Sequence, residues 1–549
     1  MFSSELCRCG VILGVWLGGI DLSHAQGDRS GSLGASLVPD PTERRRIEQA
    51  IPAQAAASPA KPRRLLIFNL NVGYGGHPSI RHASLAFALM GEKTGAFETV
   101  ISQDPAMFKP ENLNRFDAVF LNNTVGNLFT EPGLRRSLVE FIYRGGGLLG
   151  VHGTTVAFTQ WPGAREDWPE FGFMLGARGA NHKDSDEHVF IKLDDRDNPI
   201  NRAFHGQGFD YRDEFFRAHD PYSRNRVRVL FSIDTDKTDV QAGQPRGDCY
   251  RADNDYALAW VRNYGRGRIF YCTIAHNPYV FWDPQMLQFY LAALQFALGD
   301  LPVPTTPSEK LNDATRAQER LGWRPGLDAT AFPQNTFFET VNTAAKLGLS
   351  YIGASSSQPV SGDIVGKFTP QLTGDDLQAI RLKLDSAGVR LLTYHVDPLP
   401  ASEPDIRSLF AFSRKMGIEA IIAEPPADAW DKIERCVKEY DVRFAVCGRT
   451  AKPGSPYRTP QDILKLCRGR DARIGAWGDV ESWRQAKVDP VKAVRQLNDR
   501  LICLRAPAQS NGILDRPGIS RSNADSTKRL FTEITRLGLK PTMFILESP

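Results

Sequence analysis

The sequence has few cysteines, no long runs of like charge and a very uneven distribution of histidine. None of the eight cysteines in 549 residues stands in a CxxC spacing, which argues against a zinc ribbon or a thioredoxin-type site. Lysine and arginine are spread along the chain and the formal net charge is only +4, so nothing indicates a nucleic-acid partner. Eight of the ten histidines lie between His77 and His276, and only His395 follows. Imidazole chemistry is therefore expected in the first half of the chain.

No apolar run in the sequence is long enough to span a bilayer. The longest candidate, residues 9–20 (CGVILGVWLGGI), follows an arginine and precedes the small-x-small tripeptide SHA, which is typical of a cleavage site. A membrane-spanning helix needs about 20 apolar residues. We therefore expect residues 1–25 to be a signal peptide and the mature protein to be periplasmic or secreted, without a membrane span. An uncleaved anchor is the alternative.

Six cysteines lie beyond the expected signal peptide, several of them in apolar, strand-like runs such as FYCTIA and FAVCGR. Cysteines in such runs are expected to be buried free thiols. A disulfide between Cys249 and Cys272 stays open, because an exported protein can meet an oxidising compartment.

The pattern after the N-terminal region predicts an α/β domain at residues 63–300. Residues 26–62 are rich in Ala, Pro, Ser and Arg without an apolar period, and we expect a disordered or loosely helical tether there. Strands that are apolar throughout and alternate with helices predict a parallel sheet covered on both faces. The expected strands are residues 65–70, 97–102, 116–123 and 148–151, and the expected helices are residues 82–90 and 134–143.

A second domain is predicted at residues 321–549, after a linker at residues 301–320 that is Pro-rich and then charged and helical. Eight strand-like runs alternate with helical stretches, which favours a (β/α)8 barrel. No helix follows the eighth run, so the barrel is either truncated or misread. The runs are residues 327–332, 349–354, 389–396, 420–423, 443–447, 474–477, 501–504 and 542–546.

Polar residues of the first domain follow the predicted strands, where open parallel sheets bind their ligands. The segment GGGLLGVHGTT has the shape of a strand-turn-helix elbow, with His152 or Gly153 at its apex. Because no Cys, Ser or Thr stands at that apex, acyl transfer through a covalent intermediate is disfavoured.

The first domain offers an imidazole and carboxylate set for catalysis. His152 and His276 each close an apolar strand, and Asp213 and Glu214 are the nearest candidate carboxylates. Such a set suits acid/base chemistry beside a sugar carbonyl, and equally a divalent metal; a plain loop salt bridge is the alternative for the two carboxylates. We predict these four as catalytic residues. The predicted substrate-binding residues are Asn71, His77, Thr154, His182 and Trp260.

Residues 64–300 resemble the ThuA-like (trehalose utilisation) family. The resemblance implies the fold of class I glutamine amidotransferases without their cysteine, and a link to the metabolism of carbohydrates, including keto-sugars. The matching landmarks are GHPSI at 76–80, FDAVFLNN at 116–123, GGGLLGVHGTT at 145–155, LGA at 175–177 with His182, Asp213-Glu214, AWV at 259–261, GRGR at 265–268 and IAH at 274–276.

Residues 320–549 resemble the xylose-isomerase-like sugar phosphate isomerase/epimerase barrels. The resemblance implies one divalent metal, held by carboxylates and histidines, and isomerisation through an enediol. The landmarks are FFE at 337–339, LGLSYI at 347–352, SAGV at 386–389, IAEPP at 422–426, GAWGDV at 475–480 and Glu547.

Several of the metal ligands implied by this second resemblance are missing. Cys447-Gly448-Arg449 replaces a His-Asn-His, Glu481-Ser482 replaces a Gly-His, and Arg505 stands where a histidine is expected. Arginine cannot ligate a metal because it stays protonated. The barrel is therefore expected to be degenerate, and its remaining candidate metal ligands are Glu424, Asp479 and Glu547.

Together these patterns predict an exported carbohydrate-metabolism enzyme in which the first domain acts on a sugar or keto-sugar and the barrel supports it. The expected partner is a small-molecule carbohydrate, and the candidate cofactor is a divalent metal (Mn, Mg or Zn). Two alternatives stay open: a metal-dependent sugar isomerase or epimerase in the barrel, and a non-catalytic sugar-binding protein. The sequence does not determine the oligomeric state.

Overall fold

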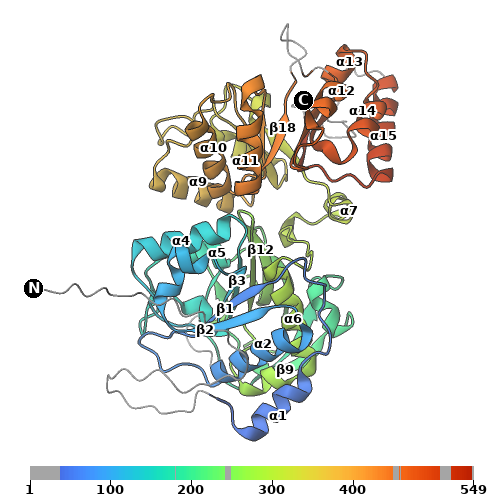
Figure 1. Cartoon of the computed structure of the whole chain (residues 1–549). Coiled ribbons are helices and arrows are strands. Elements are labelled where there is room, and N and C mark those ends of the chain that lie inside the picture. The colour runs from blue at the N-terminus through green and yellow to red at the C-terminus, as the bar shows by residue number, and fades with distance from the viewer. Residues whose placement is uncertain are drawn as a thin grey trace, which may run out of the picture. The chain divides into compact units, whose positions relative to one another are not determined.

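The computed structural model describes residues 38–179, 181–241, 249–448, 457, 459–506 and 521–546, and only the backbone of residues 521–525 (Figure 1). The predicted signal peptide and Glu547 lie outside this range. The six cysteines beyond the predicted signal peptide are buried, as predicted. In the part of the chain that is described, no helix is both long and apolar enough to cross a membrane.

The first domain is built on a nine-stranded sheet with the order β2-β1-β3-β4-β13-β12-β11-β8-β9. The strands from β2 to β13 are parallel neighbours, which confirms the predicted sheet. The remaining pairs are antiparallel. They extend the sheet beyond the parallel part that the sequence pattern predicts. Every strand except β12 and β8 runs in the same direction. The strands are β1 (Arg64–Phe68), β2 (Glu98–Ser102), β3 (Ala118–Leu121), β4 (Gly147–Val151), β8 (Glu187–Leu193), β9 (Phe209–Asp213), β11 (Arg228–Ile233), β12 (Ala257–Tyr264) and β13 (Gly267–Cys272).

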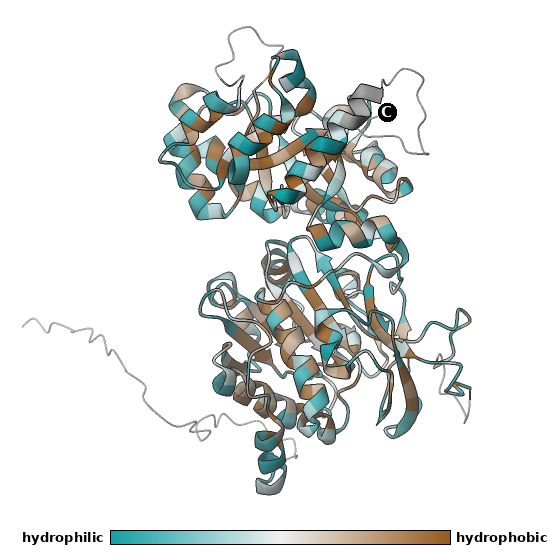
Figure 2. Cartoon of the chain, turned by 90° about the vertical axis from the view of Figure 1, so that its right-hand side faces the viewer, coloured by the Kyte–Doolittle hydropathy of each residue, from teal (hydrophilic) through white to brown (hydrophobic). Residues whose placement is uncertain are grey.

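Helices cover both faces of the central part of this sheet, where β1, β3, β4 and β13 are buried almost throughout (Figure 2). On one face α2 (Ile80–Thr94) and α6 (Pro284–Leu298) pack on the strands. On the other face lie α4 (Pro132–Tyr143) and α5 (Pro169–Leu175). The shorter elements are η1 (Pro105–Phe108), α3 (Pro110–Leu113), η2 (His152–Val156), β5 (Thr159–Gln160), β6 (Arg165–Glu166), β7 (Arg178–Gly179), η3 (Pro199–Phe204), β10 (Ala218–His219) and η5 (Pro278–Trp282).

Residues 41–50, within the segment predicted as a disordered or loosely helical tether (26–62), form a helix that packs on the first domain. Helix α1 (Pro41–Ala50) starts with a capping box between Asp40 and Glu43 and has a proline in its first turn, all of which favour a helix start. Ile47 is fully buried in the same core as α2 and α6. This helix has only two buried residues, Ile47 and Ala50, among many charged ones. Its sequence therefore shows no clear apolar period.

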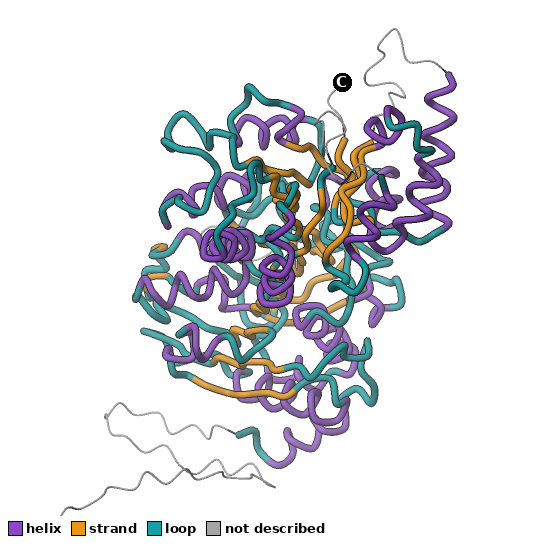
Figure 3. The backbone as a smooth tube through the Cα atoms, turned by 45° about the horizontal axis from the view of Figure 1, so that its top comes forward, coloured by secondary structure: helices purple, strands orange, loops and turns teal. Residues whose placement is uncertain are grey.

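The second domain is a closed barrel of eight parallel strands in sequence order, as predicted (Figure 3). The barrel closes because β21 pairs with both β14 and β20, so no helix after the last strand is needed. The strands are β14 (Pro325–Asp328), β15 (Tyr351–Ser355), β16 (Arg390–His395), β17 (Ala420–Ala423), β18 (Arg443–Val446), β19 (Ile474–Asp479), β20 (Leu501–Ala506) and β21 (Met543–Leu546).

Two hydrophobic cores stabilise the barrel, one between strands and helices and one inside the ring of strands. The segment predicted as a linker contains η6 (Ser308–Lys310) and α7 (Asp313–Leu321). The other helices are η7 (Ala329–Ala331), α8 (Phe337–Lys346), α9 (Gly374–Ser386), α10 (Glu403–Lys415), η8 (Ala427–Ala429), α11 (Trp430–Tyr440), α12 (Pro460–Cys467), α13 (Val480–Gln485), α14 (Pro490–Leu497), η9 (Asn498–Arg500) and α15 (Arg521–Arg536).

Candidate functional site

Four side chains converge at the carboxyl edge of the first sheet, where parallel strands place their ligand-binding residues. His77 follows β1, His152 follows β4, His276 follows β13 and Glu214 follows β9. One nitrogen or oxygen atom from each lies within 4.8 Å of the others. Residues from distant parts of the sequence therefore form one site, which we call the histidine site.

His152 lies in the turn that was predicted to form an elbow. It follows β4 directly, is fully buried and has a φ of 42°, a left-handed conformation that side chains rarely adopt. The next residue, Gly153, has no room for a side chain, because a Cβ there would lie 2.6 Å from His77 Cε1. The tight turn thus brings the His77 and His152 rings close together, with centroids 4.8 Å apart.

Three polar atoms of the histidine site form a nearly equilateral triangle. His152 Nε2 lies 3.2 Å from Glu214 Oε1, His276 Nδ1 lies 3.3 Å from the same oxygen, and the two nitrogens are 3.3 Å apart. Glu214 is largely buried. Burial alone would raise the pKa of Glu214, but its contacts with the His152 and His276 imidazoles outweigh burial and hold that pKa well below its ordinary value. The carboxylate is therefore ionised and ready to bind a cation.

The protonation of His152 is constrained by a backbone carbonyl. His152 Nδ1 lies 3.0 Å from the Thr273 carbonyl oxygen, which can only accept a hydrogen bond. A neutral ring that donates from Nδ1 presents a bare lone pair at Nε2, the atom that faces Glu214 and His276. Burial lowers the pKa of His152, although the Glu214 contact opposes this shift. The neutral ring is favoured, and its free nitrogen points into the site.

Asp213 and His182 contact the residues that form the triangle. Asp213 is fully buried and accepts hydrogen bonds from the His276 amide (3.1 Å), the Asn277 amide (3.0 Å) and Asn277 Nδ2 (2.8 Å). Burial raises its pKa to about 7 despite these bonds. His182 Nδ1 lies 3.3 Å from Glu214 Oε2, the oxygen that the triangle does not use. Asp213 thus fixes the loop of His276, and His182 orients Glu214.

His77 stands edge-on to the other two histidines, at interplanar angles of 89° to His152 and 85° to His276. Its Nδ1 is buried without a hydrogen-bond partner. Burial and the two neighbouring imidazoles hold the pKa of His77 well below its ordinary value. Tyr74 packs on the His77 ring at 4.9 Å, and Trp161 packs on Tyr74 at 5.6 Å. The site therefore has an aromatic wall.

Three of the predicted substrate-binding residues make other contacts. Asn71 Oδ1 accepts from the Val125 amide, and the Thr154 hydroxyl is bonded to the Leu121 carbonyl. Trp260 is fully buried and donates from its indole to the Leu175 carbonyl. These three side chains shape the strand ends and the core, whereas His77 belongs to the histidine site and His182 contacts its Glu214.

One of the barrel residues predicted as metal ligands, Asp479, caps a helix and faces an arginine. Asp479 Oδ1 accepts from the amides of Glu481 and Ser482 at the start of α13, and Oδ2 lies 3.8 Å from Arg505. Glu547 lies outside the described residues. Among the described residues, the histidine site is the one group arranged to hold a metal. The described part of the barrel contains no comparable group.

Among the buried polar atoms of the barrel without a hydrogen-bond partner are Asp328 Oδ2 and Thr393 Oγ1. Both flank Gly353, on the strands to either side of β15. A buried hydroxyl without a partner costs about 1–3 kcal/mol. We expect Thr393→Val, which keeps the shape and removes the hydroxyl, to raise the free energy of unfolding by about 1 kcal/mol in a urea titration.

Thr340→Val is the matched control for this change. Thr340 is equally buried, but its hydroxyl donates to the Thr336 carbonyl and accepts from Gln358. That substitution should therefore lower stability by about 1 kcal/mol. A loss of stability in Thr393→Val as well would show that water or a ligand satisfies the Thr393 hydroxyl in solution.

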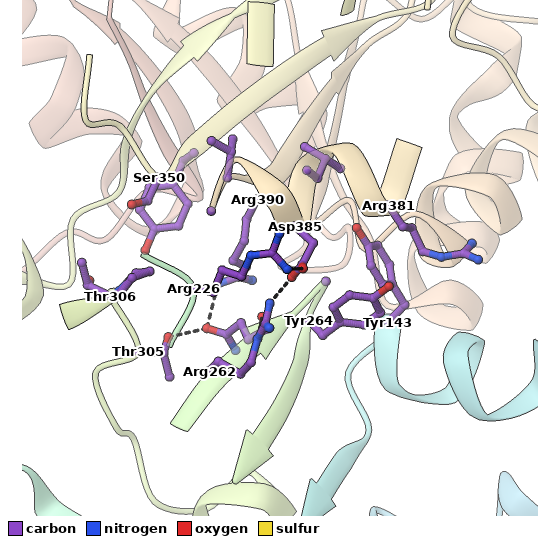
Figure 4. Close-up of a pocket in the computed structure, with 17 residues that line it drawn as sticks. Tyr143, Arg226, Arg262, Tyr264, Thr305, Thr306, Ser350, Arg381, Asp385 and Arg390 are labelled. Atoms are coloured by element: carbon purple, nitrogen blue, oxygen red, sulfur yellow. Dashed lines mark hydrogen bonds and ion pairs between the residues drawn. The ribbon is translucent and has the colours of Figure 1, made fainter. Parts of the chain in front are cut away.

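A separate pocket is lined by arginines that already have acidic partners (Figure 4). Arg226 and Arg262 both pair with Asp385 on α9. Arg381, one turn earlier on the same helix, pairs with Glu170 at 3.2 Å. Each of these arginines has an acidic partner, so the ion pairs give these residues a structural role.

Two further residues, which are not among the predicted site residues, support the histidine site. The Thr273 carbonyl orients His152, and the buried Asn123 side chain binds the turns around it. Asn123 closes a predicted strand, which is a usable signal, but backbone carbonyls leave no trace in a sequence.

Residues 64–297 match the family model of ThuA, described as trehalose utilisation. No curated protein matches the chain. The chain is thus similar to the ThuA family over its first domain.

Solved structures similar to parts of the chain include an uncharacterised protein from Parabacteroides distasonis, which is 21% identical. The match covers 41% of this chain and 90% of that protein, with a TM-score of 0.35. A ThuA-like protein from Bacteroides uniformis is 18% identical, covering 44% and 92%, with a TM-score of 0.36. A sugar phosphate isomerase/epimerase from Parabacteroides distasonis is 12% identical, covering 42% and 87%, with a TM-score of 0.30.

Proposed function

We propose that this protein is a metal-dependent enzyme that acts on a carbohydrate, and that the histidine site is its active site. The observation that carries the proposal is the triangle of His152 Nε2, His276 Nδ1 and Glu214 Oε1, whose sides measure 3.2–3.3 Å. When neutral His152 donates from Nδ1 to the Thr273 carbonyl, its Nε2 has no proton to donate to Glu214. A cation between these two atoms would then bind to both.

The dimensions of the triangle suit a first-row divalent metal. Ligand distances of about 2.0–2.1 Å in a tetrahedral site place neighbouring ligand atoms about 3.3 Å apart. Two imidazoles and one carboxylate would bind one face of the metal ion. The coordination positions on its opposite face would stay open for water and substrate. Nitrogen-rich sets favour Zn²⁺ or a similar transition metal, whereas Mg²⁺ prefers oxygen ligands. Of the expected cofactors, Zn and Mn therefore suit the site better than Mg.

A metal held there would polarise a sugar carbonyl or hydroxyl and lower the pKa of bound water. The protein's own groups complete the chemistry. His77 stands beside the triangle with a free Nδ1, and we assign it the transfer of a proton to and from the substrate. Tyr74 and Trp161 provide an aromatic wall on which the apolar face of a sugar ring can pack.

The carbohydrate substrate is supported by the trehalose-utilisation family model that matches the first domain. A sugar or keto-sugar is the proposed substrate, with isomerisation, elimination and hydrolysis as the candidate reactions. In this proposal the protein is exported and the barrel supports the first domain.

The test is the metal content of the purified full chain, measured by elemental analysis beside Glu214→Gln and Asp479→Asn. One equivalent of metal is expected in the unmodified chain and in Asp479→Asn, and none in Glu214→Gln. Loss of metal in Asp479→Asn alone would favour a barrel isomerase. No metal in any of the three would overturn the proposal, and calorimetry with monosaccharides would then test plain sugar binding.

A further inference from the structure

The turns that carry the three histidines are joined by one buried side chain, Asn123. Its Oδ1 accepts from the Gly153 amide at 3.1 Å, next to His152. Its Nδ2 donates to the Ala275 carbonyl at 2.9 Å, next to His276, and to Ser79 Oγ at 3.0 Å, two residues after His77. Ser79 Oγ in turn donates to the same Ala275 carbonyl. The amide therefore links three strand ends that lie far apart in the sequence.

An asparagine at this place is chemically specific. A side-chain amide carries one oxygen acceptor and two N–H donors, and all three contacts of Asn123 need that combination. Asn123 is fully buried and has a φ of 54°, in the left-handed region that Asn enters more readily than most residues. Aspartate has the same shape and lacks the donors, so it would face the Ala275 carbonyl with a second acceptor.

We infer that Asn123 is a positioning residue that sets the distances between the metal-binding histidines; this inference rests on the function proposed above. Asn123 touches none of the three imidazoles through its amide. It acts on the backbone beside each of them, as residues behind a metal site commonly do. Removing such support typically weakens metal binding by about 10- to 100-fold.

Asn123→Asp in the full chain is the variant that tests this role, and Asn122→Asp is its matched control. Asn122 is equally buried, but its Nδ2 binds Asn69, the Ile80 carbonyl and Ser84 rather than the histidine turns. Both variants lose stability, because each buries an acid without its donors. We expect the dissociation constant for Zn²⁺ to rise about 10- to 100-fold in Asn123→Asp and less than about threefold in Asn122→Asp.

The visible absorption of bound Co²⁺ gives a readout that a general loss of stability does not change, because it reports the ligand geometry. The Co²⁺ spectrum should differ from that of the unmodified chain in Asn123→Asp and stay the same in Asn122→Asp. Ser79→Ala, which removes one hydroxyl of the same network, provides a milder variant if Asn123→Asp does not fold. It should shift the spectrum in the same direction.

The outcomes separate this inference from the function on which it rests. If the unmodified chain binds neither Zn²⁺ nor Co²⁺, both are overturned. If it binds them and Asn123→Asp or Ser79→Ala binds with the same affinity and spectrum, the metal site stands and the role of Asn123 is overturned. Equal changes in Asn122→Asp and Asn123→Asp would also overturn it, because the effect would then be one of general stability.

Discussion

A chain with His152→Gln is expected to bind Zn²⁺ more than 100-fold more weakly than the unmodified chain. His152 supplies the nitrogen at one corner of the triangle, and its Nδ1 is held by the Thr273 carbonyl. Loss of a direct ligand should exceed the roughly 10- to 100-fold loss caused by changes behind a metal site. Competition with a coloured chelator, on protein first freed of metal, measures the change.

His82→Gln is the control for the His152 experiment. His82 is also fully buried, but it bridges the Pro78 carbonyl and Glu43 on the far side of the first turn of α2. The His82→Gln variant should be less stable than the unmodified chain. Its Zn²⁺ affinity should stay within about threefold of the unmodified chain, since no direct metal contact is lost. Equal affinities in His152→Gln and the unmodified chain would place the metal elsewhere and contradict the proposed site.

The barrel was predictable from the sequence because each of its strands is a short apolar run between helices. The first sheet was predictable only in its parallel half. Strand β8 alternates buried and exposed residues, and β12 and β11 join it through antiparallel pairs. Such strands lie outside the repeating strand-helix pattern, and their positions in the sheet depend on contacts between distant segments.

The histidine site was predictable as a set of residues but not as a geometry. His152 and His276 stand at strand ends, where a parallel sheet gathers its polar residues. The different roles of Asp213 and Glu214 were not predictable, because neighbouring side chains diverge only once the backbone is placed: one holds amides and the other faces the imidazoles. Trp260, predicted to bind substrate, lies fully buried in the core. An aromatic residue in a strand suits a core and a sugar site equally well, and the sequence pattern does not distinguish the two.

The change Ile47→Ala in helix α1 is expected to lower the free energy of unfolding strongly. Ile47 is fully buried in the core of the first domain, and α1 contacts both α2 and η5. These elements begin just after His77 and His276, so the helix braces the segments that carry two of the histidines. Replacing a buried isoleucine with alanine typically costs about 2–5 kcal/mol. A urea titration should show a loss of that size.

Arg45→Ala is the matched control on the same helix, since Arg45 is exposed and points away from the core. A surface change of this kind usually alters stability by less than about 0.5 kcal/mol. If Ile47→Ala behaves like Arg45→Ala, residues 41–50 are a loose tether in solution, as their composition alone suggested. If it shows the full loss, a chain shortened to begin at residue 63 lacks part of the core of its first domain, and metal measurements on the histidine site require a chain that begins before α1.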